Sequence, residues 1–430
     1  MLKGLKQIFS ARNKDIRKKI LFTLLLLFIY KVGTSVRVPG TENITQDLGF
    51  LELLNVMGGG SLKNFSIFAL GVTPYISASI IVQLLQMDII PYFSNLAKEG
   101  HTGRVKLNKI TRYLGIVFAF LQGIVMSFSF IGSGATAIEY LRVSLILTAG
   151  TCFLLWLGDQ ITSKGVGNGI SIIIMAGILI STPNMMVDAF SSFVAIGSVQ
   201  ETALGVTKFI LFILVYLAII VGVVFIEKSE RRIPIQYSNK TITAYNAKQA
   251  YIPFKLNSAG VMPVIFASSL ISIPAFIASF IKNDSFSLFV NKYINYNTVT
   301  GFILYILLII LFTYLYTFMA SGLRPKELAE NLNKQGGYIP GIRPGIETKN
   351  YISKVLSRTT FLGALFLIII AGLPILVSNL STLPTSVTVG GTGLLIVVGV
   401  ALETYNQIES SISAKQYGKG YYRKWKILYF

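Results

Sequence analysis

Few side chains in this sequence are of the kinds that catalyse reactions or hold metals. His101 is the only histidine and Cys152 the only cysteine, which excludes a multi-histidine metal site and an internal disulfide. Residues 158–170 are rich in glycine, but they lack the phosphate-binding pattern G-x-x-x-x-G-K-[ST] and a complete dinucleotide-binding pattern. No Ser-His-Asp or paired-acid constellation stands out, so we expect neither an enzyme nor a bound cofactor.

Two segments that are long enough to protrude carry arginines. Arg231 and Arg232 precede the alternating run Ile-Pro-Ile-Gln-Tyr, which predicts a short strand and a hairpin. Arg343 lies between Pro340-Gly341 and Pro344-Gly345, which restrict the backbone around one exposed cation. A guanidinium held in this way suits an acidic partner or an RNA phosphate. The alternative is ordinary solvated charge on a loop.

Some aliphatic side chains in the sequence could form a barrier that excludes water. Val72 and Ile76 lie four residues apart and therefore share a helix face. The stretch Gly71–Ser79 is echoed at Gly260–Ser268, with six of nine positions identical, and Ile265 holds the place of Ile76. Two such groups from opposing halves would form a constriction that resists water and ions. Ordinary helix packing is the alternative reading of these residues.

The composition of the chain predicts that these residues are held by helices embedded in a membrane. The chain has 430 residues, 53% of them hydrophobic and 13% charged, whereas a soluble protein carries about 25% charged residues. We expect an all-α polytopic membrane protein whose spans each need ~20 apolar residues. The ten expected transmembrane helices are 20–36, 72–90, 110–132, 142–157, 170–186, 208–226, 260–281, 301–321, 359–378 and 390–405.

Positive charge alternates between the segments that join these spans. The segments expected on one side hold 29 Lys and Arg residues, and those on the other side hold four. This bias predicts that both termini lie in the cytoplasm. The helices after Gly71 and Gly260 then run in opposite directions, which is typical of two inverted five-helix halves around a central pore. The basic, apolar start lacks a cleavage site, so we expect an uncleaved first span.

The stretch before Gly71 is too short and too interrupted to cross a bilayer, whereas Pro74 suits the first turn of a helix. We expect a short half-helix over 58–71, a break, and then a full helix. Broken backbone at membrane depth survives only where it lines a cavity or is buried in protein. The expected division is a cytoplasmic tail 1–19, a first half 20–190, a second half 191–405 with cytoplasmic loops 227–259 and 322–357, and a cytoplasmic tail 406–430.

Five stretches together resemble the SecY family, the channel subunit of the bacterial Sec protein translocase. They are Asn64–Leu85, Trp156–Ile174, Arg231–Tyr237, Asn257–Ser269 and Tyr338–Gly345. They follow the family's order, so the resemblance covers essentially the whole chain. It implies a protein-conducting channel of the plasma membrane that passes unfolded secretory polypeptides and releases transmembrane segments sideways through a lateral gate.

The resemblance also implies roles for individual residues. The pore ring would consist of Val72, Ile76, Ile174, Ile265 and Ile396. The plug, within residues 58–71, would include Gly60, Ser61, Phe65, Ile67 and Leu70. The lateral gate would include Ser77, Ile80, Gln122, Asn257 and Ser269, and Arg231, Arg232 and Arg343 would dock the motor or the ribosome. The implied partners are SecE-like and SecG-like small membrane subunits, a SecA-like ATPase motor, the ribosome, unfolded preproteins and the lipid bilayer.

Two other function classes stay open at this point. A secondary transporter also uses inverted repeats and broken helices, but it predicts a polar or charged site at the membrane midplane. A scaffold or insertase whose basic loops bind RNA would have no aqueous path.

Overall fold

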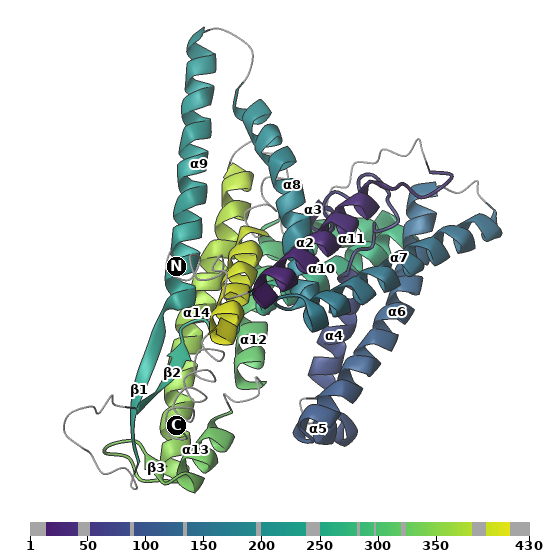
Figure 1. Cartoon of the computed structure of the whole chain (residues 1–430). Helices are drawn as coiled ribbons and strands as arrows, with labels where there is room; N and C mark the ends of the chain where they lie inside the picture. Colours follow the sequence, from purple (N-terminus) through teal and green to yellow (C-terminus); the bar gives the residue numbers. More distant parts are fainter. Residues whose placement is uncertain are drawn as a thin grey trace.

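Helices occupy each of the ten expected spans in the computed structural model of the chain (Figure 1). The structure describes residues 14–41, 52–86, 90–131, 136–194, 199–237, 250–281, 284–295, 298–319, 324–380 and 393–412. The helices of the first half are α2 (Lys14–Ser35), α4 (Thr73–Leu85), α6 (His101–Ile131), α7 (Ala137–Lys164) and α8 (Gly169–Phe193). Those of the second half are α9 (Val199–Lys228), α10 (Met262–Ile281), α12 (Val299–Met319), α14 (Ile346–Leu380) and a last helix over 393–412. Shorter helices are α3 (Glu52–Met57), α5 (Pro91–Lys98), α11 (Asp284–Tyr293) and α13 (Pro325–Lys334).

Several helices, α6 and α14 among them, are much longer than the spans expected from hydropathy. α6 has 31 residues and α14 has 35, because both begin with polar turns that lie outside the apolar stretch. Length and apolar content allow six of the described helices to cross a membrane. The apolar stretches of α4 and α10 are shorter, as expected for helices that begin within the membrane rather than at its surface.

α10 joins the two halves of the helical body. It packs against α4 and α6 from the first half and against α12 from the second. α4 leads from α3 down to α5, whereas α10 leads from the end of β2 toward α11 (Figure 1). The two helices that carry the repeated motif therefore run in opposite directions, as the inverted repeat predicts.

A small sheet projects from the foot of α9. β1 (Glu230–Tyr237) pairs antiparallel with β2 (Ala250–Lys255), which confirms the predicted hairpin. Its tip, residues 238–249, lies outside the described residues. β1 also pairs with β3 (Gly337–Tyr338), giving the strand order β2-β1-β3. Ile233 and Ile235 face a core that α13 and α14 complete, so the two loops expected in the cytoplasm form one body.

The expected half-helix lies earlier in the chain than 58–71. Residues 52–57 form α3, and the stretch that follows consists of turns as far as Val72. Gly59 and Gly60 have φ angles of 72° and 79°, and Phe65 has a φ of 42°. Backbone in this left-handed region cannot continue a right-handed helix, so the consecutive glycines end the helix at Met57.

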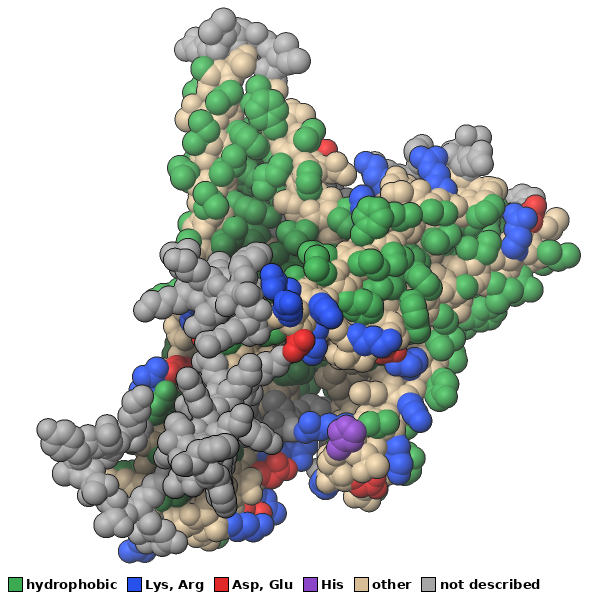
Figure 2. Space-filling model, viewed as in Figure 1, with side chains coloured by type: hydrophobic (Ala, Val, Ile, Leu, Met, Phe, Trp, Pro, Cys, Tyr) green, Lys and Arg blue, Asp and Glu red, His purple; other side chains and the backbone are tan. Residues whose placement is uncertain are grey.

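Hydrophobic and basic side chains are unevenly distributed on the face that Figure 2 shows. Hydrophobic side chains cover α8 and α9, while Lys and Arg are frequent on the lower part, around α5, α13 and the strands (Figure 2). Between the α5 lobe and the strand lobe the surface is hollowed (Figure 2). Together with the six apolar spans, this distribution is that of a multi-pass membrane protein.

Candidate functional site

The five residues expected to form a ring come from four helices and meet in one place. Val72 is the N-cap residue of α4 and Ile76 lies one turn further along. Ile174 comes from α8, Ile265 from α10 and Ile396 from the last helix. All five are between 3% and 6% exposed and belong to one apolar cluster. We call them the aliphatic ring.

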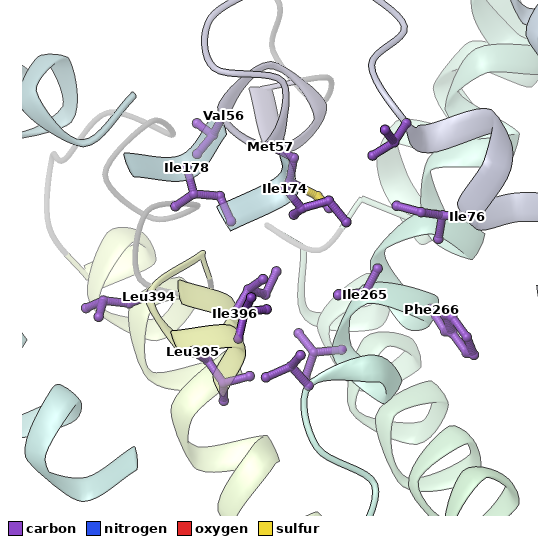
Figure 3. Close-up of a cluster of buried hydrophobic side chains, with 14 of the residues drawn as sticks. Val56, Met57, Ile76, Ile174, Ile178, Ile265, Phe266, Leu394, Leu395 and Ile396 are labelled. Carbon is purple, nitrogen blue, oxygen red and sulfur yellow. The ribbon is translucent and has the colours of Figure 1, made fainter. Parts of the chain in front are cut away.

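The helix starts aim these side chains at a common centre. Asn168 caps α8, since its side chain accepts hydrogen bonds from the amides of Ile170 and Ser171 at 3.2 and 3.5 Å. Labelled ring members on α4, α8, α10 and the last helix surround one small space (Figure 3). Aliphatic groups converging in this way offer water no hydrogen bonds, so they resist the passage of ions.

Several cluster members near the ring were missed by the sequence reasoning. Val56 and Met57 at the end of α3 lie beside Ile178 and Ile174 (Figure 3). These α3 residues precede the expected plug range, so the segment next to the ring begins earlier than 58. The signal was present as the short apolar run Glu-Leu-Leu-Asn-Val-Met before the glycines, but six residues are too few to place from periodicity.

The residues expected in the plug pack mainly on α6 and α7. Phe65 stacks on Phe130 with ring centroids 4.5 Å apart, and both belong to a cluster that includes Leu70. Ile67 is half-buried against the same cluster. Ser61 is fully buried, and its hydroxyl has no hydrogen-bond partner among the described residues. Gly60 is half-buried at the hinge-like turn after α3.

Backbone hydrogen bonds also join the stretch after Ser61 to the segment that follows α2. The amide of Val38 donates to the carbonyl of Phe65 at 3.0 Å, and the amide of Ile67 donates to the carbonyl of Val36 at 3.0 Å. These bonds pair residues 36–38 with residues 65–67 like two short strands. The expected plug range therefore contains a firmly anchored part, residues 61–71, in addition to the glycine turn.

Four of the five expected gate residues lie on helices that meet between the two halves. Ser77 and Ile80 are buried on α4, Ser269 is buried on α10, and Gln122 is half-buried on α6. An apolar cavity opens at this seam. It is lined on α4 by Ile80, Gln83 and Leu84, on α10 by Phe266, and on α12 by Phe312, Leu315 and Tyr316.

Asn257 lies elsewhere. Its Nδ2 donates to Oε1 of Glu227 at 2.6 Å and to the carbonyl of Gly260 at 3.0 Å. Its backbone lies beside Gly363 of α14. Asn257 thus joins the foot of α9 to the start of α10, and it is not among the residues that line this cavity. Sequence reasoning missed this because the bond to Glu227 spans 30 positions.

The three arginines expected to dock partners lie on the projecting sheet or on the turn that follows it. Arg231 and Arg232 are exposed on β1, and Arg343 is exposed on the turn after β3. Arg232 hydrogen-bonds Glu230 at 2.7 Å and lies over the ring of Tyr251. The side chains of Arg231 and Arg343 have no ion-pair partner among the described residues. Both are therefore available to bind an anionic surface.

Comparison with known proteins agrees with this geometry. The SecY family profile matches residues 66–405. The chain is 47% identical over 423 residues to "Protein translocase subunit SecY" of Staphylococcus aureus NCTC 8325, covering 95% of this chain and 97% of that protein. The corresponding protein of Staphylococcus carnosus TM300 is 45% identical over 423 residues, with the same coverage.

Solved structures share the fold at low sequence identity. One described as "The structure of a protein conducting channel" has a TM-score of 0.65 at 18% identity and covers 92% of both chains. Another, "Sec61 in the Canine ribosome-channel complex from the endoplasmic reticulum", has a TM-score of 0.63 at 18% identity and also covers 92% of both chains. With nearly half of its residues identical to curated members over almost its full length, the chain belongs to the SecY family.

Proposed function

We propose that this chain is the protein-conducting channel of the plasma membrane, and that the aliphatic ring is its seal. An unfolded secretory polypeptide threads between the two halves while the ring closes around it. The observation that carries the proposal is the convergence of five aliphatic residues from four helices on one buried point between inverted halves. A passive conduit of this kind is not an enzyme, so a partner supplies the energy.

The seam between α4 and the α10–α12 pair is the proposed lateral gate. Its cavity is apolar, as a route for a hydrophobic segment requires. A segment of ~20 apolar residues that leaves through the seam is favourably buried in lipid. Ser77, Ile80, Gln122 and Ser269 act at this seam, whereas Asn257 acts at the foot of α9.

The proposed topology places the sheet, both chain termini and the lower lobes in the cytoplasm, because Lys and Arg are concentrated in those segments. The proposed partners are a ribosome and a SecA-like motor at the sheet, and SecE-like and SecG-like subunits in the membrane. The similarity to a channel described in a complex with a ribosome supports the first of these.

The seal is tested by replacing Ile76 and Ile265 together with Ser in the purified channel with its small subunits. Two hydroxyls in the ring offer water hydrogen bonds, so the ion conductance of the resting channel should rise severalfold in a planar bilayer. The matched control replaces Ile210 and Ile303, which are 53% and 52% exposed on α9 and α12, and should conduct like the unaltered channel. Unchanged conductance in the ring variant would exclude the seal.

Docking is tested by replacing Arg343 with Glu. Arg343 lies on an exposed turn, so the variant channel should insert into the membrane and show the same thermal unfolding as the unaltered channel. ATP-driven or ribosome-coupled translocation should fall by about tenfold or more, as expected for charge reversal at a contact worth about 1.4 kcal/mol or more. Arg358→Glu, on the shaft of α14, is the matched charge control. Normal translocation by the Arg343 variant would remove this residue from the docking surface.

A further inference from the structure

One face of α8 holds the last turn of α3 by its backbone. A methyl group on Gly177 of α8 would overlap the carbonyl oxygen of Met57 and would lie 2.9 Å from the hydroxyl of Tyr30. The turn after α3 comes equally close, since a methyl group on Gly59 would lie 3.3 Å from Cα of Gly177. Only glycine at position 177 permits this approach of the two backbones.

Ser181, one turn further along α8, supplies a hydrogen bond at the same place. Its hydroxyl lies 3.2 Å from the carbonyl oxygen of Val56 and 3.2 Å from that of Gly177. The Val56 carbonyl also accepts a hydrogen bond from the amide of Gly59 at 3.1 Å, so the Ser181 hydroxyl adds a second bond, one that comes from α8 rather than from the turn itself. A hydroxyl has a single hydrogen, and Ser181 can therefore satisfy either acceptor without rearrangement of α8.

The same stripe of α8 also carries the ring. Ile174, Gly177, Ile178 and Ser181 follow the spacing of one helix face and are all buried. With a rise of about 1.5 Å per residue, Ser181 lies roughly 10 Å along the axis from Ile174. The contact with α3 is thus stacked directly on the aliphatic ring, beside Val56 and Met57 (Figure 3).

The remainder of the expected plug is held differently. Residues 65–67 pair with residues 36–38, and Phe65 and Leu70 are buried against α6 and α7. Gly60, between the two parts, has a positive φ, and a β-carbon added to it would meet no atom within 4 Å. Residues 61–71 are thus attached to α2, α6 and α7, and one side-chain bond joins α3 to them, from the amide of Lys63 to Oδ1 of Asn55 at 2.9 Å. A movement of residues 52–60 about the glycine turn breaks this bond as well as the contact with α8.

We propose that Gly177 and Ser181 are positioning residues that form a reversible latch for α3 in the closed channel. When α3 moves away, the Ser181 hydroxyl exchanges the Val56 carbonyl for the Gly177 carbonyl of its own helix. No buried donor is left unpaired, so α3 can leave and return, while the closed state keeps the net contribution of one hydrogen bond between α8 and α3. The inference rests on the proposed function, because it assumes that α3 covers the ring from outside.

Resting conductance of the complete channel tests the latch. Ser181→Ala removes one neutral hydrogen bond from the closed state and should raise the open fraction roughly fivefold. Gly177→Ala forces α3 off its contact and should raise it on the order of tenfold or more. Thr182→Ala, which removes a hydroxyl bonded only within α8, and Gly222→Ala, which has open space around it on α9, are the matched controls and should change nothing.

A second measurement keeps the test decisive if the Gly177 variant folds poorly. In a Cys152→Ala background, a cysteine replacing Val56 should react several times faster with a membrane-impermeant maleimide when Ser181 is also replaced by Ala. If the Ile76/Ile265 variant conducts but the Ser181 and Gly177 variants stay closed and unreactive, the latch is wrong and the seal stands. If the ring variant stays closed too, the proposed function itself fails.

Discussion

The two copies of the repeated motif have the same local structure and different attachments. Gly71 and Gly260 have φ angles of 56° and 62°, and each is followed two residues later by a helix whose second residue is proline. The amide of Ile76 bonds the carbonyl of Val72 at 3.1 Å, and that of Ile265 bonds the carbonyl of Val261 at 3.3 Å. These two helix starts place both isoleucines in the aliphatic ring.

The attachments differ at the carbonyl of each glycine. The Gly71 carbonyl accepts a hydrogen bond from Thr151 of α7 at 3.3 Å, which fixes α4 to its own half. The Gly260 carbonyl accepts its bond from Asn257, which also bonds Glu227 at the foot of α9. The start of α10 is therefore connected to the hairpin that carries Arg231. In our proposal, one copy belongs to a rigid block, and the other joins the proposed gate to the proposed docking surface.

The strongest test of this difference is Asn257→Leu. The substitution leaves the Glu227 carboxylate without its buried donor, and hydrogen bonds to charged groups contribute about 1.5–3 kcal/mol. Thermal unfolding in detergent should show a clear drop in midpoint, and coupling between hairpin docking and channel opening should weaken. Glu227→Gln retains an acceptor for Asn257 and serves as the control, with a much smaller drop expected. Equal drops in the two variants would refute the role given to this bond.

An intermediate effect is expected from Gly71→Ala and Gly260→Ala. A β-carbon in the left-handed region costs roughly 1–2 kcal/mol, and neither position has another atom closer than 4.0 Å to the added group. The two variants should therefore lower the unfolding midpoint equally. Gly71→Asn and Gly260→Asn should lower it less, because Asn tolerates this backbone conformation. Unequal losses for the two alanine variants would show that the copies are not locally equivalent.

The smallest effect is expected from Thr151→Val. The change keeps the shape of the side chain and removes one long neutral hydrogen bond, worth about 0.5–1.5 kcal/mol. The unfolding midpoint should fall slightly, and docking-coupled opening should be unaffected. Thr148→Val on the same helix, whose hydroxyl bonds only Ser144 of α7, is the matched control. A loss of coupling in the Thr151 variant would contradict the assignment of α4 to a rigid block.

Much of the fold was predictable because it depends on local patterns. Apolar stretches located ten helices, alternation of Ile233 and Ile235 located a strand, and glycine and proline spacing located both copies of the motif. Hydropathy underestimated α6 and α14 because their first turns are polar yet helical. The third strand was not predicted, since Gly337–Tyr338 becomes a strand only by pairing with β1 about a hundred positions earlier.

The sequence by itself determined which residues are aliphatic, where helices begin and which motif is repeated, because these follow from composition and near-neighbour spacing. Only the tertiary structure decided that Asn257 bonds Glu227, that Val56 and Met57 lie against α8, and that residues 65–67 pair with residues 36–38. Each of these is a contact between segments far apart in the chain. Their formation depends on how whole helices pack, and a single glycine such as Gly177 gives no sign of the backbone it will meet.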